Sequence, residues 1–112
     1  MPVRLAELRK LVLALPGVEE GSSYGTAAWR LRKKLLARLR EDDETLVVSC
    51  SWDERAELCE ADADVFFFTD HYANYEYVLV RLPAASRAKL ASVLENAWRR
   101  HASKRMLADF DG

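Results

Sequence analysis

The chain has 112 residues, of which half are hydrophobic and 31% charged, and it contains only four glycines and three prolines. This composition excludes collagen-like, coiled-coil and disordered proteins, and the length predicts one domain spanning residues 1–112. No apolar run approaches the roughly 20 residues of a membrane helix, and the N-terminus lacks a secretory pattern, so we expect a cytoplasmic protein. Cys50 and Cys59 match neither a disulfide framework nor a zinc motif and are expected to be core thiols.

The first element expected is a helix over residues 5–15, where leucines and valine recur at helical spacing. Pro16-Gly17 ends this pattern, and Pro2 suits the first turn of such a helix. Residues 22–25, Ser-Ser-Tyr-Gly, are typical of a turn.

A β-hairpin is expected next, because apolar residues alternate with arginines on either side of residues 33–35. Residues that pair directly across a hairpin share a face, and side chains alternate between faces along each strand. Trp29 and Ala37 therefore share one face only if the residue numbers of each directly paired couple add up to an even number. A two-residue turn at Lys33-Lys34 gives an odd sum, so we expect an odd loop of about three residues around positions 33–35. The arginines expected together on the other face are Arg30, Arg32, Arg38 and Arg40.

Three more strands and a helix are expected in the middle of the chain. Residues 45–50 are apolar enough for a central strand. Ser51 and Glu54 match a capping box, which predicts a helix that ends near Ala61. The β-branched and aromatic stretches 65–69 and 77–82 predict two further strands.

The long C-terminal helix has the most regular apolar spacing in the chain, and Ser103 is placed to cap a short helix that follows it, through Phe110. The resulting order, α-β-β-β-α-β-β-α, predicts an α+β fold. We expect a two-layer sandwich with an antiparallel sheet of about five strands, helices on one face and the other face partly open. The apolar positions of the long helix are Leu90, Val93, Leu94, Ala97 and Trp98.

Charge is strongly sorted along the chain, although the net charge is only −1. Residues 21–40 carry six cations and no acid, and residues 41–64 carry ten acids against Arg55 alone. A second basic region, residues 81–105, contains one acid, Glu95. If the fold brings the two basic regions together, the protein acquires a positive face.

The basic and aromatic residues are the candidates for function, because cations neutralise phosphates and aromatic rings stack on bases. The alternative for these cations is an ordinary solvated face whose arginines pair with the acidic middle segment. The candidate phosphate contacts are Arg30, Arg32, Lys33, Lys34, Arg38, Arg40, Arg81, Lys104 and Arg105. The candidate stacking or pocket residues are Tyr24, His71, Tyr72, Tyr75 and Tyr77.

Motifs for catalysis or metal binding are absent from the sequence. It contains no glycine-rich phosphate loop, GxSxG or HExxH, so we expect no enzyme activity, cofactor or metal. An acid–base site around His71 is conceivable, but a hydrogen-bonded structural histidine is the favoured interpretation. His101 stands at the end of the long helix, where a partial positive charge is favourable without any function.

Several short segments, in order over nearly the whole chain, resemble the MmcQ/YjbR family of small bacterial proteins. They are Leu-Pro-Gly-Val-Glu-Glu at 15–20, Ser-Tyr-Gly-Thr at 23–26, the hairpin residues 34–39, FFTDHYANY at 67–75, Val-Leu-Val-Arg-Leu at 78–82, Ala-Trp-Arg at 97–99 and Lys-Arg at 104–105. The chain differs from the family pattern at Ala27, Asp70 and Ser103, where proline is common.

The resemblance implies a fold like that of the frataxin homologue CyaY and of secretion chaperones, and a DNA-binding label. Iron binding in a CyaY-like fold requires an acidic first helix, whereas this one carries Arg4, Glu7, Arg9 and Lys10 and so forms no acidic ridge. We therefore expect a non-catalytic DNA-binding protein, a monomer or weak dimer, without strong sequence specificity. The alternatives are a chaperone-like domain that binds a protein partner and, third, a small-ligand binder or enzyme around Ser23, Tyr24 and His71.

Overall fold

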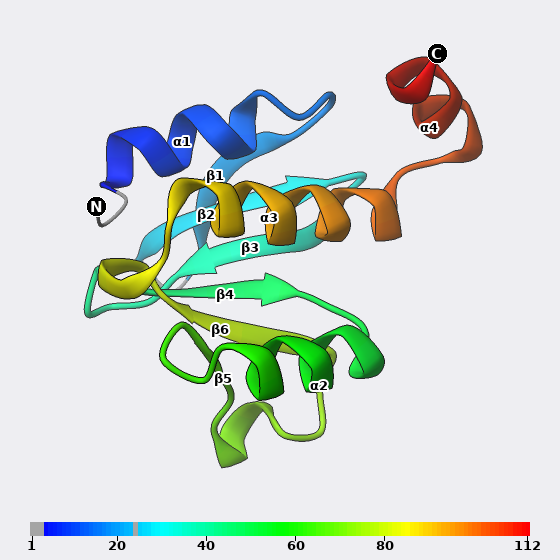
Figure 1. The fold of residues 1–112 in the computed structure, drawn as a ribbon. Helices are drawn as coiled ribbons and strands as arrows, with labels where there is room; N and C mark the ends of the chain where they lie inside the picture. The colour runs from blue at the N-terminus through cyan, green and yellow to red at the C-terminus, as the bar shows by residue number, and fades with distance from the viewer. Residues whose placement is uncertain (1–3, 24) are drawn as a thin grey trace.

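Six antiparallel strands form one sheet in the computed structural model, which describes residues 4–23 and 25–112 (Figure 1). The spatial order of the strands is β1-β2-β3-β4-β6-β5. The predicted α+β class is confirmed, with one strand more than the five expected. The roles expected of Pro2 and Tyr24 lie outside the described residues. The strands are β1 (Glu19–Ser23), β2 (Thr26–Leu31), β3 (Lys34–Leu39), β4 (Thr45–Ser49), β5 (Phe66–Phe67) and β6 (Tyr77–Arg81).

The helices lie on one side of the sheet, with α1 beside α3 and α4 beyond the end of α3 (Figure 1). Serine side chains cap three of them, because each hydroxyl accepts a hydrogen bond from a backbone amide of the first turn. These caps are Ser51, Ser86 and Ser103, the first and last of which were expected. The helices are α1 (Leu5–Leu13), α2 (Trp52–Ala61), α3 (Arg87–His101) and α4 (Lys104–Asp111), with short 3₁₀ turns η1 (Asp70–Tyr72) and η2 (Leu82–Ala84).

Strand β1 is the element that the sequence did not predict. It pairs with β2 from Glu19, opposite Arg30, to Ser23, opposite Thr26. Its residues are polar and mostly exposed, so it shows no alternation of apolar and polar side chains. The backbone ladder holds this edge strand in place, together with side-chain hydrogen bonds to Glu20 from Trp29 Nε1 at 2.9 Å and from Arg9 at 3.2 Å.

In the β2–β3 hairpin, Trp29 and Ala37 share one face of the sheet as expected, but the turn that connects the strands differs from the expected one. The expected loop around 33–35 is wrong: the turn is a two-residue one, with Arg32 and Lys33 at φ 53° and 70°. Next to the turn, Leu31 pairs with Lys34 and Arg30 with Leu35. A β-bulge then shifts the register by one residue, so that Trp29 lies opposite Ala37. The extra residue, Leu36, is buried in the core beside Ala37, so the bulge rather than the loop corrects the parity.

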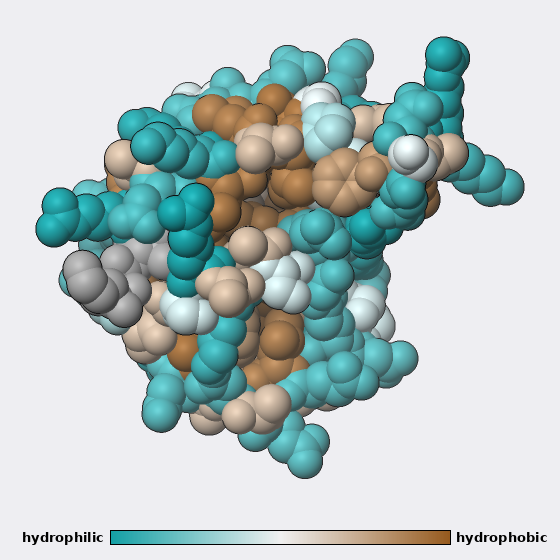
Figure 2. Space-filling view, turned by 45° about the horizontal axis from the view of Figure 1, so that its top comes forward, coloured by the Kyte–Doolittle hydropathy of each residue, from teal (hydrophilic) through white to brown (hydrophobic). Residues whose placement is uncertain are grey.

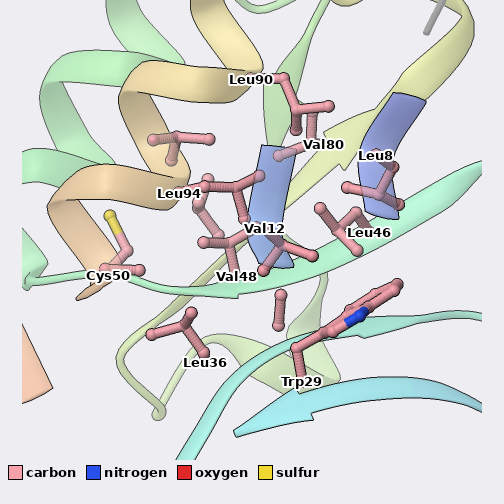
Figure 3. Packing of buried hydrophobic residues seen from close by; sticks show 14 of the residues in the cluster. Leu8, Val12, Trp29, Leu36, Leu46, Val48, Cys50, Val80, Leu90 and Leu94 are labelled. Carbon is pink, nitrogen blue, oxygen red and sulfur yellow. The ribbon is translucent and has the colours of Figure 1, made fainter. Parts of the chain in front are cut away.

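The core lies between the helices and one face of the sheet (Figure 3). Trp98 joins this core and donates its Nε1 proton to the carbonyl of Pro16 at 2.8 Å, which ties α3 to the end of the α1 segment. Within the described residues, no buried side-chain nitrogen or oxygen lacks a partner. The labelled residues of the core are Leu8, Val12, Trp29, Leu36, Leu46, Val48, Cys50, Val80, Leu90 and Leu94.

The opposite face of the sheet is partly covered by the chain that follows α2. Val47, in the central strand β4, is only 1% exposed on this face and shares a hollow with His71, Tyr72 and Tyr75. The segment with η1 therefore crosses the face that was expected to be open. Among the described residues, no helix has the length and apolar character needed to cross a membrane.

Candidate functional site

A hollow of about 520 Å³ opens on the face of the sheet opposite α1 and α3. We call it the tyrosine pocket. Strands β1, β3, β4 and β6 form its floor, and the segment around η1 forms its wall. Its volume falls within the roughly 300–1,000 Å³ of small-ligand sites. Its lining residues are Ser23, Leu35, Arg38, Glu41, Val47, His71, Tyr72, Tyr75 and Tyr77.

Arg38 supplies the positive charge of the tyrosine pocket. It is only 9% exposed, and its guanidinium donates to the hydroxyl of Tyr72 at 3.3 Å, to Thr26 Oγ1 at 3.4 Å and to Glu41 at 3.3 Å. Burial opposes its charge, but the hydrogen bonds to Tyr72 and Glu41 raise the pKa of Arg38 above its ordinary value. The pocket therefore holds a permanent, oriented cation beside aromatic rings.

The aromatic wall is made of rings that meet edge to face. His71 contacts Tyr72 with ring centroids 4.8 Å apart, and Tyr72 contacts Tyr77 at 6.2 Å, both nearly perpendicular. Tyr75 is 58% exposed at the rim of the pocket. This arrangement leaves the ring of Tyr75 accessible to a flat apolar group.

Arg55 holds the aromatic wall in place from within α2. Its Nη1 and Nη2 donate to backbone carbonyls of residues 72, 73, 75 and 77, at 3.1 to 3.4 Å. The same guanidinium lies over the rings of Trp52 and Phe68, at 4.8 and 4.0 Å from their centroids. Sequence reasoning missed this positioning role, although Arg55 stood out as the lone cation among ten acids.

The cations predicted to share one face are brought together only in part. Arg30 pairs with Leu35 across the hairpin, so both side chains point to the side of the tyrosine pocket. Arg40 is partly exposed just after β3. Arg32 is not on this face, because it lies in the turn and donates to the carbonyl of His101 at 3.4 Å. Lys33 lies in the same turn.

The remaining candidate cations lie elsewhere. Arg81 is exposed, stacks 3.9 Å above the ring of Phe67 and donates to the carbonyl of Ala63, beside a separate small hollow. Lys104 and Arg105 are on α4, on the helix-bearing side of the molecule (Figure 1). The nine candidate cations therefore do not form one continuous positive face.

A second hollow, of about 420 Å³, adjoins the tyrosine pocket and shares Leu35, Tyr75 and Tyr77 with it. We call it the Ser49 hollow. Here the two basic regions of the sequence do meet, at Lys34 and Arg100. Its other lining residues are Ser49, Glu76 and His101.

His101 does not behave as the simple helix-terminal cation expected from the sequence. Burial, and then the nearby charges of Arg100 and Lys34, hold the pKa of His101 below its ordinary value. Its Nε2 lies 2.8 Å from Ser49 Oγ, a contact between residues 52 positions apart that no local pattern reveals. Burial and the neighbouring positive charges thus disfavour the protonated form of the imidazole.

Apolar side chains also reach the surface of the helix-bearing side. Figure 2 shows them gathered toward the middle of this side, with charged residues around them. Leu5 and Leu13 of α1 and Phe110 of α4 are each more than a third exposed. A protein that binds a partner in the manner of a chaperone would need an exposed apolar surface of this kind.

Neither cysteine is placed for chemistry. Cys50 is buried, and its burial raises the pKa of the thiol to about 12, so it remains protonated. Burial also raises the pKa of Cys59.

The family model described as YjbR matches residues 13–100 of the chain. The chain belongs to the YjbR family. This span includes the linings of both hollows apart from His101, and it confirms the resemblance found in the sequence.

The solved structure of Deinococcus radiodurans protein DR2400, whose domain is described as DUF419, resembles this YjbR-family chain with a TM-score of 0.74. The two share 16% sequence identity over 95% of this chain and 86% of that one. A likeness at this identity shows the fold alone. No curated protein matches the chain.

Proposed function

We propose that this YjbR-family domain binds single-stranded DNA without catalysing a reaction on it. The observation that supports this proposal is the tyrosine pocket, in which the buried cation Arg38 lies beside three tyrosine rings. Proteins bind single strands by combining a cationic groove with aromatic rings on which bases stack. The pocket offers the aromatic rings and a guanidinium that is paired with Glu41, and Arg30 supplies a further cation on the same face.

The shape of the site favours a single strand over a duplex. The tyrosine pocket is a recess in the sheet face, and a base enters a recess only when it is not stacked and paired in a duplex. Tyr75, exposed at the rim, provides a ring for stacking. Arg30, on the same face, is placed to neutralise a flanking phosphate. This mode of binding involves no reading of base sequence.

Fluorescence anisotropy with a labelled oligonucleotide of about ten nucleotides, and with its duplex, tests the proposal across a salt series. We expect the single strand to bind more tightly. Tyr75→Ala is expected to weaken binding about tenfold by loss of stacking, and Arg30→Glu to weaken it about fivefold or more at low salt. Lys10→Glu, an exposed charge reversal on α1, is the matched control and should have no comparable effect.

Two results would overturn the proposal. One is equal binding of duplex and single strand. The other is equal sensitivity to Arg30→Glu and Lys10→Glu, which would show that only the net charge of the protein matters.

A second candidate function is the binding of a small anionic ligand with an aromatic ring. The observation in its favour is that one hollow brings together Ser23 and His71, two of the three residues around which this alternative was placed. A free mononucleotide separates the two candidates. If it displaces the oligonucleotide at equal molar concentration, the pocket is a small-ligand site, whereas a strand-binding site requires the longer chain for its affinity.

A further inference from the structure

The Ser49 hollow collects donors and positive charge from three separate elements. Lys34 begins β3, Ser49 ends β4, and Arg100 and His101 end α3. Ser49 is only 4% exposed and is hydrogen-bonded, so it is part of the framework of the hollow. Lys34 is exposed at the mouth.

The charge balance of the Ser49 hollow is positive. The acidic residue in its lining is Glu76, which pairs with Arg100 at 3.2 Å. Lys34 adds a second positive charge, and protonation of His101 adds a third. Arg32 reaches the carbonyl of His101 from the β2–β3 turn, so another cation lies close by. An anion bound in the hollow would relieve the repulsion among these groups.

The hydroxyl of Ser49 links the protonation of His101 to the mouth of the hollow. Ser49 Oγ accepts a hydrogen bond from Arg100 Nη1 at 2.9 Å and lies 2.8 Å from His101 Nε2. When the imidazole is neutral and carries its proton on Nδ1, Ser49 donates to Nε2. When the imidazole is protonated, both Arg100 and His101 donate to Oγ, and the hydroxyl proton is free to turn toward a ligand.

We propose that the Ser49 hollow is a phosphate-binding subsite whose affinity rises when His101 is protonated. The donors would be the hydroxyl of Ser49, the ammonium of Lys34 and the guanidinium of Arg100. A tetrahedral oxyanion suits this set, because it offers several acceptor oxygens and a negative charge. The subsite extends the proposed strand-binding function, since the hollow continues from the tyrosine pocket, but a free anion tests it without any DNA.

Sulfate is the appropriate first probe, because its charge does not change over the pH range in which histidine titrates. The side-chain signals of His101 are followed by NMR in the full chain, from about pH 5 to 8, with and without sulfate. We expect sulfate to raise the pKa of His101 by about one unit, which by linkage means about tenfold tighter binding to the protonated form. Sulfate affinity that is unchanged over this range would overturn the proposal.

Matched lysine variants separate the subsite from general charge. Lys34→Gln should weaken sulfate binding severalfold, whereas Lys33→Gln, an exposed neighbour that lines a different hollow, should not. His101→Gln should abolish the pH dependence, and Ser49→Ala should weaken binding even at low pH. Equal losses in Lys34→Gln and Lys33→Gln would mean that sulfate senses only the overall charge.

Oligonucleotides with and without a 5′-phosphate identify the source of the phosphate. If Lys34→Gln weakens only the phosphorylated strand, the subsite holds a terminal phosphate, and if it weakens both equally, the subsite holds an internal phosphodiester. Failure of the strand-binding proposal would appear instead as insensitivity to Tyr75→Ala. Sulfate binding at His101 would survive that failure, so the two proposals fail separately.

Discussion

The helix-bearing face of the sheet carries Trp29, Leu46 and Val80 into an apolar core, whereas the opposite face carries Arg38, Ser49 and Tyr77 into hydrogen-bonded hollows. The first face is stabilised mainly by removal of apolar surface from water, which is not directional. The second depends on donors aimed at particular oxygens. The comparison shows that one sheet can stabilise the fold with one set of side chains and hold polar groups rigidly with the alternate set.

The segment from β5 to β6 makes the opposite face more than a solvated surface. Arg55 fixes this segment by four hydrogen bonds to carbonyl groups. The aromatic wall is held from within α2 by Arg55, and Arg38 adds a hydrogen bond to the hydroxyl of Tyr72.

Substitution in the core should have the largest effect on stability and little on the site. Leu94→Ala, at a fully packed position, should lower the free energy of unfolding by about 3 kcal/mol. Urea denaturation measures this change, and Leu13→Ala, 45% exposed on α1, is the control expected to change stability by less than about 0.5 kcal/mol. Loss of strand binding in folded Leu94→Ala protein would contradict the separation of the two faces.

Substitution of Arg55 should increase local opening of the aromatic wall of the tyrosine pocket more than it lowers the stability of the whole domain. Arg55→Met removes the guanidinium from four carbonyls, of which those of Tyr72 and Tyr75 keep a backbone donor, and should cost about 2 kcal/mol of stability. Amide hydrogen exchange should rise between residues 69 and 77 but not in α3. Arg55→Lys should not restore protection, because one ammonium group lacks the forked geometry of guanidinium. Uniform loss of protection over the whole chain would show that the segment is an integral part of the core.

Removal of the acidic side chain of Glu41 at the tyrosine pocket should increase the affinity for single-stranded DNA rather than lower it. The pKa of Glu41 is held below its ordinary value by its own backbone amide and by Arg38. It is therefore ionised at neutral pH and repels a strand. Glu41→Gln should increase single-strand affinity about twofold at low salt and less at high salt. Glu57→Gln, an exposed acid on α2, is the control; if it has the same effect, the position of the charge does not matter.

Acid sensitivity at His101 should be the smallest of these effects. Because burial, Arg100 and Lys34 depress its pKa in the folded protein, the unfolded chain binds this proton more readily. The neutral imidazole of His101 therefore contributes to the free energy of unfolding above the ordinary histidine pKa. This contribution is lost as the pH falls from that value through the lower pKa of the folded protein. The difference in urea midpoint between about pH 7.5 and 5.5 should shrink in His101→Gln. An unchanged difference would assign the acid sensitivity to other groups.

Local patterns were sufficient to predict most helices and strands. The spacing of Leu90, Leu94 and Trp98 predicted α3, and the Ser51 cap predicted the start of α2. Strand β1 was missed because its polar residues carry no periodic signal. The hairpin turn was misjudged because a parity argument cannot tell a longer loop from a bulge.

The site was predicted as a set of residue types but not as an arrangement. Arg38 and the tyrosines at 72, 75 and 77 were all candidates, and the structure joins them in one pocket. Lys104 and Arg105 were also candidates, and the structure puts them on the other side of the molecule.

The sequence by itself determined the fold class, because the spacing of apolar residues decides which face of each element leaves water. Only the tertiary structure decided which polar groups meet. Arg55 contacts carbonyls 17 to 22 positions away, and Ser49 meets His101 across 52 positions. Such contacts depend on strand register and on the path of a connecting segment, and neither is encoded in a repeating pattern along the chain.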